Sequence, residues 1–437
     1  MSHIHINRSL FRGLVAGLLL FLPTNGGVKA EPGEGIHLGP LKLSPHAGAT
    51  TSVETNIYRL SVDEIAASTA DAATAAGIQV NPGLAGEMAS STLEARFGYD
   101  HYLKFYPGYK DISYLDNYTL SGSLVLFPQG KLGITIKEQS RNRSFVNSSE
   151  VSLDGGASTE DIGFSDALSE RLSNDTSVGL RFTPGGALDL LLNTGWYHER
   201  TTLVQDSTSV AEAPVTKNDL PLYAGARWRF FPRTALALDI NFRPVYVEKE
   251  EPSRMLDVQT GIEGQVTPNI QVVTKIGYGK VSSTDASVEG KGALVAQGLV
   301  AWTPIDNQTL NFTGYRTLRK EFYTDYILNS GVGLRYKGLF LEEKLELTSA
   351  VLLETPKLYV PENDDGSYDR QDQRIRFNLG AGYRMTDWLS LNGNYLLTRV
   401  NSEPLEAVTT VGPAGLDAST SNDFTQSVFS VGAIATW

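Results

Sequence analysis

The end of the chain has the pattern of a β-strand that closes on an aromatic residue. The last residues read SVFSVGAIATW, and the series taken in twos from the end is Trp437, Ala435, Ala433, Val431 and Phe429. These side chains share one face of a strand, because successive side chains point to opposite sides. Outer-membrane barrels end on such a strand with its aromatic residue at the lipid–water interface, and a soluble β-sandwich is the alternative.

The beginning of the chain has the three parts of a secretory signal peptide. Arg8 and Arg12 precede the apolar run 14–22, and small residues around Ala30 form a cleavage site. We therefore expect residues 1–30 to be removed and residues 31–437 to form the mature barrel, with 31–45 as a periplasmic lead-in. The absence of Cys excludes disulfides and a lipoprotein anchor.

Charge and hydropathy limit the partners that the protein can have and the way in which it can cross a membrane. The net charge is −12, and signal-peptide removal takes away three further cations. An acidic surface argues against nucleic acid as a partner and suits contact with lipopolysaccharide and its divalent cations. No later stretch is apolar enough for a membrane-spanning helix, so the chain would cross a membrane as strands.

From residue 78 onward, short turns alternate with long polar loops. The predicted short turns are 126–130, 182–186, 230–234, 266–270, 302–307 and 385–388, and all but the last contain Pro. The predicted loops are 142–174, 201–219, 248–254, 282–291, 354–373 and 401–423. Pro fits the end of a strand because it donates no ladder hydrogen bond. This asymmetry is typical of outer-membrane barrels, with short periplasmic turns and long extracellular loops.

The segments between these turns alternate between an apolar and a polar face, as in 236–246 and 374–385. We therefore predict an all-β, transmembrane, antiparallel up-and-down β-barrel of about eighteen strands. Sixteen strands remain open, because 173–182 and 255–266 alternate weakly. A short helix is expected over 61–77, where an N-cap and acidic residues lead into an Ala-rich run that Gly77 ends.

Charged residues recur on the polar faces and are the candidate lumen-lining residues. They are Arg227, Arg229, Asp239, Arg243, Arg335, Glu342, Lys344, Glu346, Arg374, Arg376 and Arg384. They could select solutes in a pore, or they could form charge pairs that rigidify the wall. Loop 142–174 is, on its length, the candidate to fold into the lumen and close it.

The sequence gives no sign of catalytic or metal chemistry. The adjacent pairs Asp100-His101 and His198-Glu199 would point to opposite faces of a strand, which is a poor geometry for a catalytic dyad. No phosphate-binding loop or metal-ligand spacing occurs. We expect a protein that is not an enzyme and that carries no metal or cofactor.

The first part of the mature chain resembles the β-barrel porin 2 family. The resemblance lies in Gly35–Pro45 (GIHLGPLKLSP), in Glu54–Arg59 (ETNIYR), where Thr55 replaces the family's Asp, and in Asn81-Pro-Gly-Leu84. Members of that family are associated with exopolysaccharide export. The resemblance implies an outer-membrane conduit that works with a periplasmic polysaccharide export protein lacking its own outer-membrane span.

The sequence therefore predicts an integral protein of the outer membrane of a Gram-negative bacterium. The favoured function is a porin-like channel for exopolysaccharide export, and the alternatives are a general or solute-specific porin and a surface adhesion barrel. The last strand should pair with the first, around 46–58. By resemblance to other outer-membrane barrels, Phe429, Val431 and Trp437 form the signal that the barrel assembly machinery recognises.

Overall fold

The protein is described by a computed structural model that covers residues 28–31, 33–55, 74–107, 114–144, 169–203, 214–248, 251–283, 290–320, 326–359, 370–404 and 423–437. The strands are β1 (Val28–Glu31), β2 (Gly35–Leu38), β3 (Leu41–Glu54), β4 (Ala75–Ala89), β5 (Leu93–Phe105), β6 (Tyr114–Leu126), β7 (Leu132–Ser144), β8 (Ser169–Gly185), β9 (Leu188–Leu203), β10 (Val215–Asp219), β11 (Leu222–Phe231), β12 (Thr234–Val247), β13 (Ser253–Thr267), β14 (Ile270–Ser283), β15 (Lys291–Ile305), β16 (Gln308–Arg319), β17 (Tyr326–Phe340), β18 (Leu345–Tyr359), β19 (Arg370–Arg384), β20 (Leu389–Pro404) and β21 (Phe424–Thr436).

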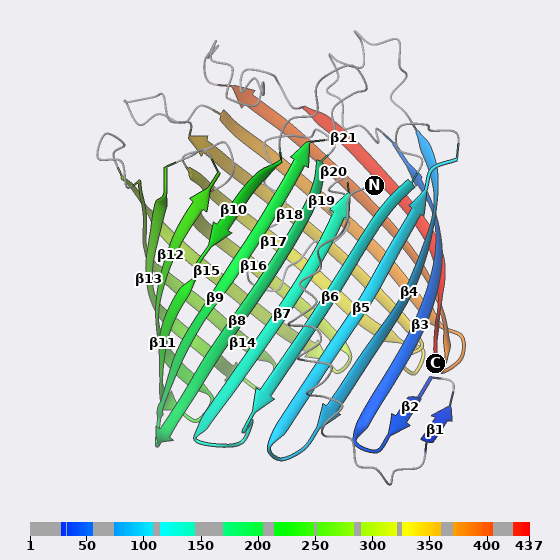
Figure 1. The fold of residues 1–437 in the computed structure, drawn as a ribbon, viewed down its shortest axis with the longest axis horizontal. Coiled ribbons are helices and arrows are strands. Elements are labelled where there is room, and N and C mark those ends of the chain that lie inside the picture. The colour runs from blue at the N-terminus through cyan, green and yellow to red at the C-terminus, as the bar shows by residue number, and fades with distance from the viewer. Residues whose placement is uncertain are drawn as a thin grey trace.

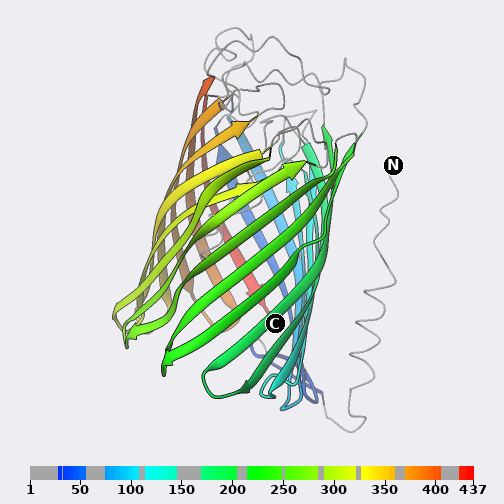
Figure 2. The ribbon, with the colours of Figure 1, turned by 90° about the vertical axis from the view of Figure 1, so that its left-hand side faces the viewer.

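These strands form a closed antiparallel barrel of eighteen strands (Figures 1 and 2). Each strand from β3 onward pairs with its neighbour in sequence, except that β10 and β11 do not pair with each other. β21 closes the ring by pairing with β3 from Thr436↔His46 to Val428↔Glu54. β10 and β11 together occupy one position between β9 and β12, and Pro221, which lacks an N–H, separates them. The prediction of an eighteen-strand barrel closed by the last strand is confirmed.

The two ends of the barrel differ in their connections. One end carries the short turns, including all six that the sequence predicts and two that it misses, at Ser90–Thr92 and Leu341–Lys344. The other end carries the long connections, such as those from Ser144 to Ser169 and from Pro404 to Phe424. Figure 1 shows the short turns at the bottom of the barrel.

Three predicted segments can be compared with the observed strand boundaries. Most of the helix expected over 61–77 lies outside the described residues, and its last part, Ala75–Gly77, belongs to β4. The first barrel strand begins at Leu41, within the segment expected to be a lead-in, because Leu41–Pro45 already pair with β4. Strand β1 spans the expected cleavage site after Ala30.

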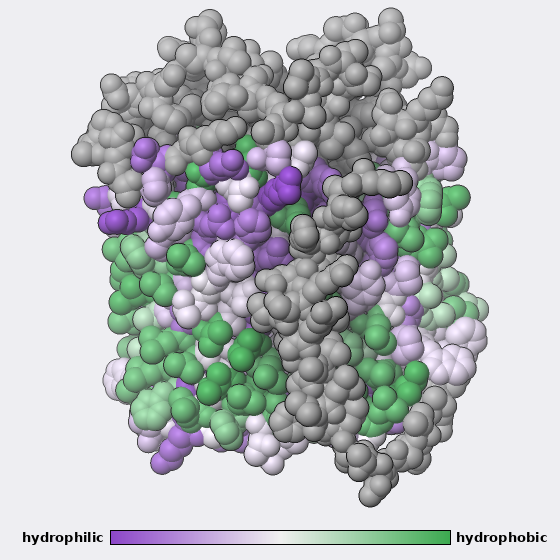
Figure 3. Space-filling view, in the orientation of Figure 1, coloured by the Kyte–Doolittle hydropathy of each residue, from purple (hydrophilic) through white to green (hydrophobic). Residues whose placement is uncertain are grey.

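The outward faces of the strands are apolar and exposed, and aromatic residues concentrate near the short turns. On β12 the outward series includes Leu236, Leu238 and Ile240, each about two-fifths exposed. Trp228 and Trp302 lie beside the short turns. Figure 3 shows apolar side chains over the lower part of the visible wall and polar side chains above them. An apolar band with interfacial aromatics on a closed barrel is the surface of a membrane-spanning barrel.

Among the residues that the structure describes, no helix is long and apolar enough to cross a membrane.

Candidate functional site: the inner wall of the barrel

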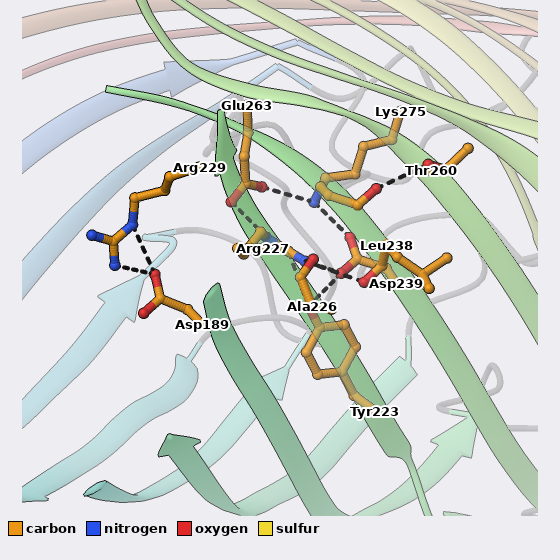
Figure 4. A network of polar contacts seen from close by, with 11 residues as sticks. Asp189, Tyr223, Ala226, Arg227, Arg229, Leu238, Asp239, Thr260, Glu263 and Lys275 are labelled. Carbon is orange, nitrogen blue, oxygen red and sulfur yellow. Dashed lines mark hydrogen bonds and ion pairs between the residues drawn. The ribbon is translucent and has the colours of Figure 1, made fainter. Parts of the chain in front are cut away.

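A network of charged side chains lies on the inner faces of β11 to β14 (Figure 4). Arg227 donates from Nη1 to Asp239 Oδ1 (2.6 Å) and from Nε to Glu263 Oε1 (2.5 Å). Lys275 Nζ lies 2.7 Å from Asp239 Oδ2 and 3.4 Å from Glu263 Oε2. The Tyr223 hydroxyl also donates to Asp239 Oδ1 (2.5 Å). Two cations and two carboxylates therefore neutralise one another across four neighbouring strands.

The alternation of the strands explains how this network forms. Asp239 is 5% exposed, whereas its neighbours Leu238 and Ile240 on the opposite face of β12 are exposed. In the ladder, Asp239 is paired with Gln259 of β13, and Glu263 with Val273 of β14. Both carboxylates share the inner face with Lys275 and lie close enough to contact it. Charge pairs with little water access must be matched, because an unpartnered buried charge is costly.

Removing one member of this network should destabilise the barrel. Asp239→Ala leaves Arg227 and Lys275 with Glu263 as their shared carboxylate, and we expect a loss of roughly 3 kcal/mol in the free energy of unfolding. Urea unfolding of the folded barrel, followed by its heat-modifiable gel mobility, measures this. Glu346→Ala is the control, because the Lys337–Glu346 pair (3.0 Å) is 46% and 42% exposed and should contribute less than about 1 kcal/mol. Equal losses in both variants would contradict the expectation.

Most of the remaining lumen candidates from the sequence also lie on inner faces. Arg229 binds Asp189 in an ion pair, and Arg243 Nη1 lies 3.9 Å from Asp219 Oδ2. Arg335 and Glu346 occupy inward positions on β17 and β18. Arg384 Nη2, at the short-turn end of β19, donates to the Glu343 carbonyl (3.3 Å).

Arg374 and Arg376 belong to a buried polar cluster on β16 to β19. Arg374 Nη2 lies 3.0 Å from Asp372 Oδ2, and Arg376 Nη2 lies 3.9 Å from Glu354 Oε2. Glu354 Oε1 also accepts hydrogen bonds from the Tyr315 hydroxyl (2.5 Å) and from Asn329 Nδ2 (3.2 Å). This cluster lies in the half of the barrel nearer the long connections, called the outer half below.

Glu342 and Lys344 do not line a strand wall. Both lie in the turn Leu341–Lys344, in which Leu341, Glu342 and Glu343 have positive φ of 53°, 57° and 66°. The alternating acids and Lys of this segment imitate a strand face in the sequence. The left-handed backbone instead reverses the chain between β17 and β18, so these two side chains stand at the short-turn rim.

The histidines that the sequence singles out form pairs between strands. His101 Nε2 lies 2.6 Å from Asp116 Oδ1 of β6, on the outward face, and His198 Nδ1 lies 2.8 Å from Asn218 Oδ1 of β10. The neighbours of these histidines, Asp100 and Glu199, face the interior. Asp100 therefore points away from His101. Its Oδ1 lies 2.8 Å from His46 Nε2 on the inner wall.

The wall of the barrel opens between β15 and β16 in the outer half. Pairing of these two strands ends at Ala296↔Arg316. On one side, β14 and β15 remain paired up to Val281↔Lys291. On the other side, β16 and β17 remain paired up to Arg319↔Ile327. Above Arg316 the β16–β17 hairpin is therefore separated from β15, while β17 stays paired with β18 up to Tyr326↔Tyr359.

The upper end of the β16–β17 hairpin lies inside the barrel. Leu318 and Leu328 sit on the face that, lower down, carries exposed Leu334, yet both are buried against Val281 and Val295. Val281 and Val295 lie on the inner faces of β14 and β15, the face that also carries Lys275. The face of the hairpin that points outward lower on β16 and β17 therefore packs on the inner wall of β14 and β15.

The tip of the hairpin reaches further across the lumen. The Lys320 amide donates to Met255 Sδ of β13 (3.4 Å), and its carbonyl accepts a hydrogen bond from Lys217 Nζ of β10 (3.3 Å). Tyr326 stacks on Tyr359, its ladder partner on β18, with ring centroids 4.1 Å apart. The hairpin is defined here as residues 317–320 and 326–329. The contacts of Leu318 and Lys320 hold it across the inner faces of β10 and β13 to β15.

In the outer half of the barrel, inward side chains are buried around most of the ring. Glu54 of β3, Val245 of β12 and Leu352 of β18, for example, are each at most 2% exposed. On β7 and β8 the inward residues Lys137 and Asp175 are exposed. Exposed inner wall therefore remains on β7 and β8, while the rest of the outer half is narrow.

Sequence reasoning missed this hairpin. It proposed that loop 142–174 closes the lumen, but 145–168 lies outside the described residues, and the flanking strands β7 and β8 account for the rest of that segment. Leu318 and Leu328 continue the apolar alternation of β16 and β17, which in the sequence looks like lipid-facing wall. The register at which β15 stops pairing with β16 carries no sequence signature.

The closed ring, the apolar outer band and the charged interior define an outer-membrane type β-barrel. No protein-family model and no curated protein matches the chain. Several solved structures are similar to it over most of their length, each with a TM-score below 0.5. The siderophore receptor PirA from Acinetobacter baumannii is 9% identical, with a TM-score of 0.46, over 94% of this chain and 81% of that one. The FrpB iron transporter from Neisseria meningitidis (F5-1 variant, apoprotein form) is 10% identical, with a TM-score of 0.45, over 90% and 81%. The ferric-catecholate import receptor Fiu from E. coli K12 (open form) is 8% identical, with a TM-score of 0.44, over 90% and 81%.

Proposed function

We propose that this barrel is a conduit for exopolysaccharide export in the outer membrane of a Gram-negative bacterium. It would work with a periplasmic export protein that delivers the polymer to its short-turn end. The β16–β17 hairpin keeps the path narrow until a chain is threaded. The resemblance of Gly35–Pro45 and Asn81–Leu84 to the β-barrel porin 2 family motivates the choice of cargo.

The observation that carries the proposal is the narrow outer half of the lumen. A general diffusion porin needs a wide aqueous path, whereas here inward side chains are buried around most of the outer half and the exposed wall is confined to a strip. Polar side chains such as Gln139, Asp175 and Asn193 point into the lumen along that strip and the adjoining strand β9. Hydroxyl-rich sugars match such donors and acceptors, and a linear polymer needs a narrow track.

Deletion of the gene from the source bacterium tests the proposal. We expect secreted exopolysaccharide to fall while polymer accumulates in the periplasm, because synthesis continues after the exit is removed. Complementation with the intact gene should restore secretion. Undiminished secretion in the deletion strain would rule out the export function.

Planar-bilayer recording of the purified barrel distinguishes export from diffusion. We expect a small conductance at rest, because the hairpin occupies the lumen. A large, steady conductance in the intact protein would favour a general or solute-specific porin instead.

A further inference from the structure

The upper ends of β15 and β16 are two strand edges on either side of the same gap in the wall. Below the gap, the two strands pair as far as Ala296↔Arg316. Above it, residues 291–295 of β15 stay paired with β14, and residues 317–319 of β16 stay paired with β17. Within the described residues, these two segments do not pair with each other.

The two edges are in register for pairing. Continued upward from Ala296↔Arg316, the antiparallel ladder sets Leu294 opposite Leu318. Leu294 is 55% exposed on the outward face of β15, and Leu318 lies on the face of β16 that points outward lower on the strand. Both leucines would face lipid in such a ladder. The extension would also satisfy backbone groups on both edges, which are costly to leave unpaired beside lipid.

The inner wall of β14 and β15 has a socket that receives the hairpin in its present position. This inner socket consists of Gly279, Val281 and Val295. The two valines pack on Leu318 and are 6% and 1% exposed. Gly279 leaves room for Leu318, since a Cβ at Gly279 would lie 3.7 Å from Leu318 Cβ. The inside of a membrane barrel is ordinarily polar, so the apolar inner socket is explained by the hairpin that covers it.

The face of the hairpin that covers the inner socket also has the composition of a lipid-facing surface. It carries Leu318 and Leu328, and toward the long connections it carries Tyr326, which stacks on Tyr359. Leucines followed by tyrosines at the upper end of the strands are typical of an outer face that reaches the membrane interface. This face therefore suits both the inner socket and the lipid.

Two glycines lie directly below the point at which the strands separate. Gly298 of β15 and Gly314 of β16 are ladder partners, two residues below Ala296↔Arg316. Packing does not require glycine there, because a Cβ would lie 3.7 Å from its nearest neighbour at Gly298 and 4.0 Å at Gly314. Glycine gives the backbone more conformational freedom than other residues do. The pair is thus placed to let the upper part of β16 change direction.

We propose that the gap between β15 and β16 is a gate with two states. In the resting state, which is the one described above, the hairpin covers the inner socket. In the open state, the upper part of β16 joins the edge of β15, Leu318 lies beside Leu294, and the outer half of the lumen widens. The open state exchanges the apolar contacts of the inner socket and the contacts of Lys320 for ladder hydrogen bonds. This inference builds on the proposed function, because it specifies how the proposed conduit opens.

Disulfide trapping in the full-length barrel tests the two states, because the chain contains no cysteine of its own. Gly279→Cys/Leu318→Cys sets the two Cβ atoms 3.7 Å apart in the resting state, within the usual range for a disulfide. Leu294→Cys/Leu318→Cys reports the open state, because in the resting state the sheet separates the outward Leu294 from the hairpin on the inner side. Both variants are oxidised in outer-membrane fragments, and the remaining thiols are counted with a maleimide.

The resting-state pair should crosslink almost completely and keep a low conductance in planar bilayers. The open-state pair should crosslink more slowly, and its crosslinked barrels should conduct severalfold more than the same barrels after reduction. Leu294→Cys/Leu334→Cys is the matched control, because both side chains point outward but adjoin in neither state, and it should stay reduced. Unaltered heat-modifiable mobility shows that each variant is folded.

A single Val281→Cys gives a second readout that leaves the hairpin itself unaltered. Val281 is covered in the resting state and uncovered in the open state. Its thiol should therefore react with a water-soluble maleimide slowly, and severalfold faster when Leu318→Asp is added. A thiol that fails to react in both barrels would show that the hairpin does not leave the inner socket.

Two further outcomes would overturn the gate. One is an open-state pair that crosslinks no more than the control in folded barrels. The other is a crosslinked open-state barrel whose conductance equals that of the reduced barrel. Either outcome leaves the export function in place if secretion still falls in the deletion strain, and undiminished secretion there would reject export without changing the crosslinking result.

Discussion

Leu318→Asp should raise the single-channel conductance of the barrel severalfold. Leu318 is 8% exposed and packs against Val281 and Val295 of the inner wall. A carboxylate in this apolar contact has no partner there, and burying it would cost several kcal/mol. The hairpin end should therefore leave the inner wall, which widens the path. Planar-bilayer recording of the intact and variant barrels measures the change.

Leu318→Met controls for the substitution itself. It nearly conserves volume and polarity, so the hairpin should stay in place and the conductance should remain low. Equal heat-modifiable mobility would show that all three proteins are folded. A folded Leu318→Asp barrel with unchanged conductance would mean that the hairpin does not limit the path.

Deleting Trp437 should lower the amount of barrel in the outer membrane severalfold. The Trp437 amide donates to the Pro45 carbonyl (2.8 Å), which fastens the end of the chain to β3 beyond the last ladder pair, Thr436↔His46. Its side chain is 51% exposed on the outward face, in line with exposed Val431 and Phe429. The deletion removes both the closing hydrogen bond and the terminal aromatic group proposed as the assembly signal.

Fractionated membranes, analysed by the heat-modifiable band of the folded barrel, measure assembly. Trp437→Phe is the control, because it keeps an aromatic group and the backbone hydrogen bond, and it should assemble nearly as well as the intact chain. Normal levels of the deletion variant in the outer membrane would refute the assembly role of Trp437.

Strand faces and turns were readable from the sequence where side chains alternate strongly. The Pro-containing turns and the series Leu236, Leu238, Ile240 identified strands and their orientation, because lipid and lumen impose opposite polarities on adjacent residues. Segment 173–182, in which apolar and polar residues alternate only weakly, is part of β8. Thr, Asn and Gly weaken this alternation but do not prevent the segment from pairing with β7 and β9. The turn Leu341–Lys344 escaped detection because it contains neither Gly nor Pro.

The charge network was predictable only as a set of inward residues. Arg227, Arg229 and Asp239 could be placed on polar faces by alternation alone. Which residues become their partners depends on the register of the strands. Lys275 and Glu263 contact Asp239 and Arg227 because of the register in which β13 pairs with β12 and β14. A shift of pairing along the strands would leave the same faces and change every ion pair.

The sequence by itself determined that this chain forms a barrel with an apolar outside, a polar inside and β21 as its closing strand, since these features follow from alternation and turns. Tertiary structure decided how open the lumen is. Leu318 and Leu328 have the pattern of lipid-facing residues, and they are buried inside only because β15 and β16 stop pairing above Arg316.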